Sequence, residues 1–119
     1  MNYLLVFIGG GLGSVCRYMI SGVVLKWIPV QFPVGTFISN LLSCLILAVT
    51  VVVISKQEMI DAGWLRLAVV VGFCGGFSTF STFSFETLQL IKNGNHMVAA
   101  GNVIISVGVC LALLLKLVK

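Results

Sequence analysis

The sequence predicts an all-α membrane protein with four transmembrane helices, the third of which is broken near its middle. Hydrophobic residues form 60% of the 119 residues and charged residues only 8%, too few to cover the surface of a soluble domain. Four apolar segments each exceed the ~20 residues that a helix needs to cross the hydrocarbon core. These segments are residues 3–27, 34–54, 64–91 and 97–118. We therefore interpret residues 1–119 as a single integral membrane domain.

Each apolar segment carries one cysteine, and no two cysteines have the spacing of a disulfide framework or a metal site. They are Cys16, Cys44, Cys74 and Cys110, which we interpret as small buried hydrophobic residues. The net charge of +4 is not gathered into a basic cluster that could contact a phosphate backbone. We therefore exclude a nucleic-acid partner.

The first segment contains small residues at the spacing that lets two membrane helices pack closely. Gly9 and Gly13 form a G-x-x-x-G pair. Gly10 and Ser14 form a second pair of small residues. Arg17 follows Gly13 by four positions and therefore lies on the same helix face. An arginine at this depth either faces protein and water or extends to the headgroups, and the sequence leaves both open.

The second segment follows a turn that contains both prolines, and it carries one polar stripe. Its polar residues recur at three- and four-residue steps, so they share a helix face: Thr36, Ser39, Asn40 and Ser43. Asn40 is the most costly of them to bury, because lipid satisfies neither its amide donors nor its acceptor. Its amide either joins two helices or donates to a passing ligand, and we favour the ligand.

The third segment contains a predicted break in its helix. As a continuous helix it would be ~42 Å long, more than the bilayer core requires. Gly75 and Gly76 have poor helix propensity, and the hydroxyls of Ser78 and Thr79 can replace the helix ladder by local hydrogen bonds. We therefore expect the break near Gly75–Thr79. Because a break frees backbone groups, a membrane tolerates it only inside protein or beside a wet cavity, and such breaks mark ion or substrate sites.

Aromatic and hydroxyl residues alternate after the predicted break. Phe80 and Phe83 would lie on adjacent turns of a helix, and Ser81 and Thr82 would flank them. Hydroxyl and amide N–H groups are donors, and a phenyl ring has a positive edge. Conduction requires weak, repeated binding, which such groups provide without a fixed cation that would trap an anion. Together with Asn40, these residues predict a pathway for a small, hard anion.

The other polar residues of the last two segments have simpler interpretations. Glu86 is the sole acid within a span. It is either a proton carrier or a residue that reaches the interface near Lys92, and we favour the interface. Asn102 and Ser106 share a helix face in the fourth segment, where we expect them to serve packing.

Positive charges at the segment ends give only a weak orientation signal. Lys26 and Lys92 lie on one side of the membrane. The side of the two termini carries four positive residues: Lys56, Arg66, Lys116 and Lys119. So small a bias is compatible with subunits that insert in both directions.

Four helices leave no wide lumen, so we expect an oligomer with the pathway between its subunits or along a subunit seam. Two inverted subunits would bring the freed carbonyls of both breaks together. Such a cluster of oxygens favours a hard cation such as sodium.

Three stretches of the chain contain residue combinations that are distinctive enough to indicate a protein family. Residues 9–14 read Gly-Gly-Gly-Leu-Gly-Ser and precede Arg17, and residues 33–36 read Pro-Val-Gly-Thr and precede Asn40. Residues 72–84 read Gly-Phe-Cys-Gly-Gly-Phe-Ser-Thr-Phe-Ser-Thr-Phe-Ser, which is the most specific of the three. Together they resemble the Fluc/CrcB fluoride channels, a family of small four-span proteins that form dual-topology homodimers. The resemblance covers essentially the whole chain.

The resemblance implies a passive fluoride channel in the bacterial cell membrane. Such a channel is not an enzyme, and it lowers fluoride toxicity by letting the anion leave the cytoplasm. The family assembles as an antiparallel homodimer with two pores. In the family pattern Asn40 would coordinate fluoride, and Phe80 and Phe83 would offer their ring edges. Ser81 and Thr82 would form a polar track beside them.

The resemblance also implies roles for groups outside the two pores. Arg17 would line the aqueous vestibule. The main-chain oxygens of Gly75 and Ser78 from both subunits would hold a structural sodium ion. The family often has Thr at the position of Ser78, a difference without effect if only the carbonyl binds.

Two other functions compete with the channel. Small proton-coupled multidrug antiporters share the length, the four spans and the dual insertion, but they need a carboxylate in the first span, where this chain has none. Glu86 would be the only substitute. A membrane subunit with no pathway of its own is the third possibility, and it predicts that replacing Asn40 or Phe83 alters only assembly.

Overall fold

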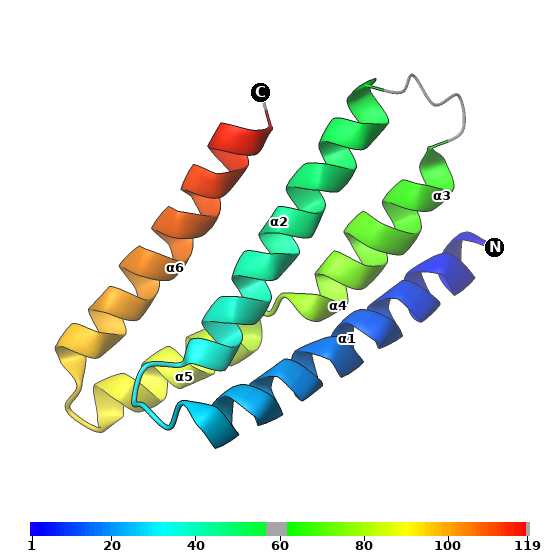
Figure 1. Ribbon diagram of the computed structural model, residues 1–119. Coiled ribbons are helices and arrows are strands. Elements are labelled where there is room, and N and C mark those ends of the chain that lie inside the picture. The colour runs from blue at the N-terminus through cyan, green and yellow to red at the C-terminus, as the bar shows by residue number, and fades with distance from the viewer. Residues whose placement is uncertain (57–61, 119) are drawn as a thin grey trace.

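The computed structural model describes residues 1–56 and 62–118, and within them four helical spans are long and apolar enough to cross a membrane (Figure 1). The elements in chain order are α1 (Asn2–Trp27), α2 (Val34–Lys56), α3 (Gly63–Leu65), η1 (Arg66–Cys74), α4 (Gly75–Phe77), α5 (Phe80–Lys92) and α6 (His96–Leu117). The third span comprises α3 to α5. The four predicted segments are confirmed, with every end within two residues of the observed one. Lys119, which entered the charge comparison, lies outside the described residues.

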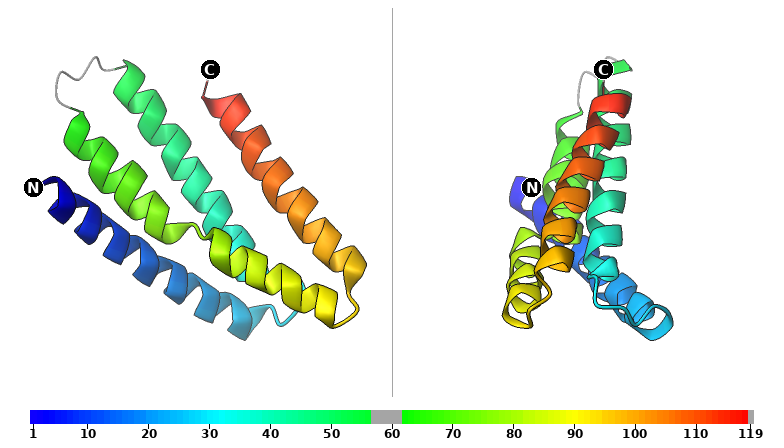
Figure 2. Two further views of the ribbon diagram at one scale, coloured as in Figure 1. Left: turned by 180° about the vertical axis from the view of Figure 1, so that it is seen from behind. Right: turned by 90° about the vertical axis from the view of Figure 1, so that its left-hand side faces the viewer.

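The start of α1, the end of α2, the start of α3 and the end of α6 lie at one end of the molecule, and the α1–α2 and α5–α6 connections lie at the opposite end (Figure 1). The count of positive residues on the two sides of the membrane assumed the same arrangement of helix ends. The molecule measures 52 × 30 × 23 Å, and the turned view in Figure 2 shows how thin it is in one direction.

The third span changes its helix neighbour at the break. Its first half, η1 and α4, packs against α1, whereas its second half, α5, packs against α6. Figure 2 shows α5 and the C-terminal part of α1 diverging toward opposite sides. Helix α2 contacts α1, η1, α4 and α6, so it is the central helix of the chain.

Glycines allow the close contact between α1 and the third span. Gly9 and Gly13 are buried, and a Cβ atom on either would overlap a carbonyl oxygen of η1, that of Ala68 or Phe73. A Cβ atom on Gly76 would overlap the carbonyl oxygen of Gly10. The predicted packing role of the first-segment glycines is therefore confirmed, and their partner is the third span of the same chain.

The first half of the third span is a π-helix of nine residues, Arg66–Cys74. Runs of π-helix are rare and usually span a single turn near functional sites. The i→i+5 hydrogen bonds of this stretch follow a different period from the 3.6 residues of an α-helix. This π-helix was not predicted, because the α-helical period was assumed for the residues before the break.

The break itself lies at Ser78 and Thr79. Both residues have extended backbone angles, with φ −82° and ψ 155° at Ser78 and φ −150° and ψ 124° at Thr79. Gly75 is helical, with φ −63° and ψ −37°. The predicted region Gly75–Thr79 is thus confirmed, and so is the expected local hydrogen bonding by the hydroxyls of Ser78 and Thr79. Of the two glycines, Gly76 packs closely against Gly10 of α1, whereas nothing lies within 4 Å of a Cβ atom on Gly75, and the extended backbone of Ser78 and Thr79 forms the break.

Substitution of Gly13 tests the contact between α1 and the third span. Gly13→Ala should lower the free energy of unfolding by about 1–3 kcal/mol, because the new methyl group must push the backbone of Phe73 and Phe77 away. The measurement is the thermal unfolding midpoint in detergent. Gly11→Ala is the matched control, since nothing lies within 4 Å of a Cβ atom there. Equal midpoints for the two variants would contradict this account.

Candidate anion pathway at the helix break

Asn40 on α2 completes the hydrogen bonding of the broken helix. In an unbroken helix the Thr79 amide would donate to the carbonyl of Gly75. Here it donates to Asn40 Oδ1 at 2.9 Å, and Asn40 Nδ2 donates to the Thr79 carbonyl at 3.5 Å. Asn40 therefore joins two helices, the alternative that the sequence analysis did not favour. The second contact is at the limit of a hydrogen bond, and the NH₂ group has two hydrogens, so donor capacity remains.

Thr79 is the N-cap of α5. Its Oγ1 accepts the amide hydrogen of Thr82 at 3.2 Å, and it lies 3.3 Å from Ser81 Oγ. A threonine N-cap satisfies one of the amides that a helix start leaves without a partner. The helix therefore restarts immediately after the break, with a line of hydroxyls at its first turn.

Two carbonyls at the end of α4 and η1 have side-chain donors. Arg17 Nε donates to the Gly76 carbonyl at 3.1 Å. The Cys74 carbonyl accepts from Ser43 Oγ at 3.1 Å and from Ser78 Oγ at 2.7 Å. Arg17 is half-buried and turned toward the protein, which decides between the two orientations that the sequence left open.

Among the described residues, the carbonyl oxygens of Gly75 and Ser78 accept no hydrogen bond and could therefore serve as ligands for a cation. Their helical partners, the amides of Thr79 and Thr82, donate to Asn40 Oδ1 and Thr79 Oγ1 instead. No hydrogen bond to either carbonyl occurs within residues 1–56 and 62–118. Neutral carbonyl oxygens of this kind are hard donors, so the two groups fit the hard cation that the sequence analysis assigned to them.

A cavity of about 300 Å³ lies beside the break, between α2, α5 and α6. Its lining residues are Asn40, Cys44, Ser78, Thr79, Phe80, Phe83, Ser106, Val107, Cys110, Leu111 and Leu114. The structure thus brings together Asn40, Phe80 and Phe83, as predicted from the sequence. Ser81, Thr82 and Arg17 are not among the residues that line this cavity.

The two phenylalanines form one wall of this cavity. Their ring centroids are 5.9 Å apart, with an angle of 38° between the ring planes. Phe83 is 8% exposed, whereas Phe80 is 79% exposed. The single chain therefore encloses one ring and leaves the other open on its surface.

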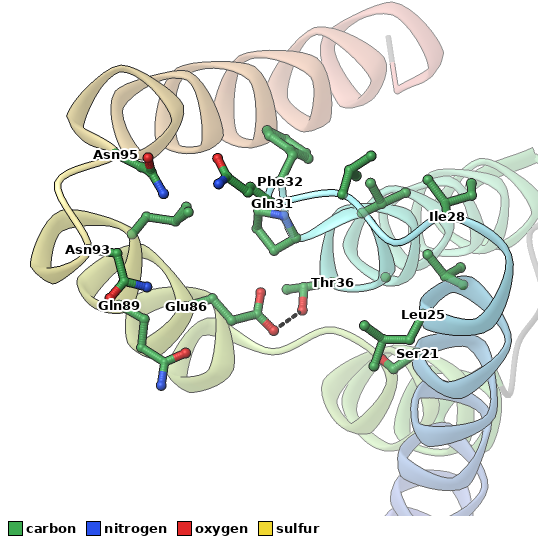
Figure 3. A pocket seen from close by; sticks show the side chains of 16 residues that line it. Ser21, Leu25, Ile28, Gln31, Phe32, Thr36, Glu86, Gln89, Asn93 and Asn95 are labelled. Carbon is green, nitrogen blue, oxygen red and sulfur yellow. Dashed lines mark hydrogen bonds between the residues drawn. The ribbon is translucent and has the colours of Figure 1, made fainter.

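A second cavity of about 350 Å³ lies at the end of the molecule where the α1–α2 and α5–α6 connections meet (Figure 3). Thr36 Oγ1 donates to Glu86 Oε1 at 2.8 Å within it, and Glu86 Oε2 is buried without a partner among the described residues. The expectation that Glu86 reaches the interface near Lys92 stays a prediction, and its contact with Thr36 was not expected. Thr36 was placed on the polar stripe, but nothing in the sequence connected it with a residue 50 positions away.

Comparison of the sequence with known proteins assigns the chain to a family. A family model described as "CrcB-like protein, Camphor Resistance (CrcB)" matches residues 4–116. The chain belongs to the CrcB family. One relative, the fluoride-specific ion channel FluC of Coxiella burnetii (strain CbuK_Q154), is 40% identical over 112 residues, which cover 94% of this chain and 90% of the relative.

Two further CrcB relatives carry the same kind of name. Fluoride-specific ion channel FluC 1 of Yersinia pseudotuberculosis serotype I (strain IP32953) is 43% identical over 110 residues, covering 92% of this chain and 85% of the relative. Fluoride-specific ion channel FluC of Solibacter usitatus (strain Ellin6076) is 36% identical over 107 residues, covering 90% and 87%. This member of the CrcB family is accordingly a multi-pass membrane protein of the bacterial type and not an enzyme.

In this CrcB protein a chain of hydrogen bonds fixes α5 against α6. Asn102 Nδ2 donates to Thr87 Oγ1 at 2.9 Å, and Thr87 Oγ1 donates to the Phe83 carbonyl at 2.8 Å. Ser106 Oγ donates to Asn102 Oδ1 at 3.2 Å. Asn102 is 1% exposed and Ser106 5% exposed, so the predicted packing role of this pair is confirmed. The sequence analysis did not find Thr87, which links the pair to the backbone of a cavity-lining residue.

Replacement of Thr79 tests the cap that restarts the helix. Thr79→Ala should lower the free energy of unfolding by about 0.5–2 kcal/mol, because the Thr82 amide loses its acceptor. Hydrogen exchange of the first-turn amides of α5 should accelerate by a matching factor. Thr79→Ser, which keeps the hydroxyl, is the control and should behave like the natural protein. Unchanged exchange in Thr79→Ala would show that the cap does not stabilise α5.

Proposed function

We propose that this protein is a fluoride-selective channel that lets fluoride leave the cytoplasm passively and so lowers its toxicity. The observation that carries the proposal is the cavity beside the helix break, which Asn40, Phe80 and Phe83 line together. The names of the CrcB relatives support fluoride as the ion.

The cavity has the chemistry that a small anion needs to replace its water shell. Hydrogens are available from the second N–H of the Asn40 amide and from the Thr79 hydroxyl. The positive edges of the two phenyl rings add weak attraction over the apolar part of the wall. None of the residues that line the cavity is charged, so nothing in the wall binds an anion tightly enough to stop its passage.

Three residues that do not line the cavity would act beside the pathway: Ser81, Thr82 and Arg17. Ser81 Oγ extends the line of hydroxyls from Thr79, and we assign Ser81 and Thr82 to a polar track beside the rings. Arg17 Nε donates to the Gly76 carbonyl just before the break. The terminal NH₂ groups of the guanidinium and its positive charge would attract anions into a vestibule.

An antiparallel homodimer would complete the pathway. Phe80 is 79% exposed on the single chain, which leaves one side of the ring wall without cover. Ser78 is the sixteenth of the 30 residues of Gly63–Lys92, so the break lies at the middle of its span. An inverted copy would therefore present its own break at the same depth. The weak charge bias of the connections permits both orientations.

In such a dimer the carbonyls of Gly75 and Ser78 would hold a structural sodium ion. The support is the redirected bonding of Thr79 and Thr82, which leaves these two oxygens without protein donors. A bound cation would compensate backbone groups that lipid cannot satisfy.

A flux assay tests the channel. Liposomes containing the purified protein should release fluoride, measured with a fluoride electrode, much faster than chloride. Phe80→Ile should slow the release about tenfold, the effect of about 1.4 kcal/mol of lost stabilisation. Phe85→Ile is the matched control, because Phe85 is 59% exposed on the same helix and does not line the cavity.

Two results of this assay would contradict the channel. Equal release of fluoride and chloride by the natural protein would remove selectivity for fluoride. Transport of cationic drugs that depends on a proton gradient and disappears in Glu86→Gln, without anion release, would instead identify an antiporter.

Thermal stability tests the sodium ion without a flux measurement. Sodium at 100 times its dissociation constant should stabilise the protein by about 2.7 kcal/mol relative to N-methylglucamine at equal ionic strength. Ser78→Thr should keep this effect, because it preserves the carbonyl. Identical unfolding midpoints in the two salts would refute the sodium site.

A further inference from the structure

Two of the four cysteines meet at the cavity beside the break. Cys44 on α2 and Cys110 on α6 both line it, both are partly exposed, and the two helices that carry them pack against each other. The other two cysteines differ in their surroundings. Cys74 is buried and its Sγ donates to the Ser43 carbonyl at 3.6 Å, and Cys16 lies on α1, away from the cavity.

The surroundings of this thiol pair favour a soft cation. Sulfur is a soft ligand, which prefers ions such as Cu(I), Ag(I) and Hg(II) to sodium or calcium. No histidine or carboxylate joins the pair in the lining, and the described residues contain no group of three that could hold a metal. Zinc usually requires four ligands in a structural site, whereas soft d¹⁰ ions are stable with two sulfur ligands.

The aromatic side of the cavity suits such an ion. Phe80 and Phe83 share the cavity with the two thiols, and a ring face attracts a cation. Val107, Leu111 and Leu114 on α6 add apolar lining to the same cavity.

We propose that Cys44 and Cys110 form a two-thiolate site for a soft cation in the wall of the cavity. On binding, each thiol releases one proton and two sulfur–metal bonds form. No group is oxidised or reduced, so the step needs only the metal ion and a base such as water to accept the protons.

A filled site should stop anion flow, a consequence that rests on the proposed channel function. The metal would occupy part of the roughly 300 Å³ between the thiols and the phenyl rings. Two thiolates neutralise the charge of Hg(II), so the block would come from the volume that the ion occupies and not from a positive charge that holds the anion.

Mercury(II) chloride is the probe, added to the purified full-length protein in a buffer that contains an excess of a monothiol. The natural protein and Cys16→Ser/Cys74→Ser, which keeps the pair, should each bind one ion per chain, read from the ultraviolet absorption of the mercury–thiolate bonds. Cys44→Ser and Cys110→Ser should each bind about 100-fold more weakly or worse, since one thiol alone loses the gain of intramolecular binding.

Elution volume and unfolding midpoint of each variant show whether it is folded. If a single variant of the pair binds mercury as tightly as the natural protein, or if Cys16→Ser/Cys74→Ser does not bind, the two-thiolate site is refuted.

Fluoride release is measured in the same samples as the fraction of each variant's own metal-free rate. Mercury should stop release in the natural protein and in Cys16→Ser/Cys74→Ser and spare Cys44→Ser/Cys110→Ser. Binding without inhibition would refute the block and keep the site. Absence of any fluoride release from the metal-free natural protein would refute the channel, while the absorption measurement would still decide the metal site.

Discussion

The exchange of hydrogen bonds between the Asn40 side chain and the Thr79 backbone is the constraint on which the rest of the structure depends. A helix that stops in the middle of a membrane leaves polar groups that lipid cannot satisfy. One amide side chain satisfies the donor and the acceptor of the same residue, at 2.9 and 3.5 Å. This fixes α2 beside the third span and determines which side of α5 faces the cavity.

The same stripe on α2 supports the third span at two further levels. Ser43 donates to the Cys74 carbonyl before the break, and Thr36 donates to the Glu86 carboxylate after it. The three contacts are spaced along one helix face, so the position of the break is set by a neighbouring helix. The CrcB chain thus carries its irregular backbone where protein, not lipid, surrounds it.

Apolar length and small-residue spacing were enough to predict the four spans and the glycine contact, and the glycines and hydroxyl residues of the third segment were enough to predict the region of the break. These features are local, since each depends on residues within one helix. The break at Ser78 and Thr79, in contrast, depends on a partner 39 positions away. The Glu86 contact and the thiol pair likewise depend on how two helices meet. Periodicity identifies the face of a helix that is buried, but not the residue that it meets.

The interruption of the third span also has an electrostatic consequence. Helix dipoles place about half a positive charge at an amide end and about half a negative charge at a carbonyl end. The carbonyl end of η1 and α4 and the amide end of α5 lie back to back at Ser78 and Thr79, midway along the span. Two fields of opposite sign therefore originate within the bilayer. A cation and an anion can each find favourable potential there without any ionised side chain at that depth.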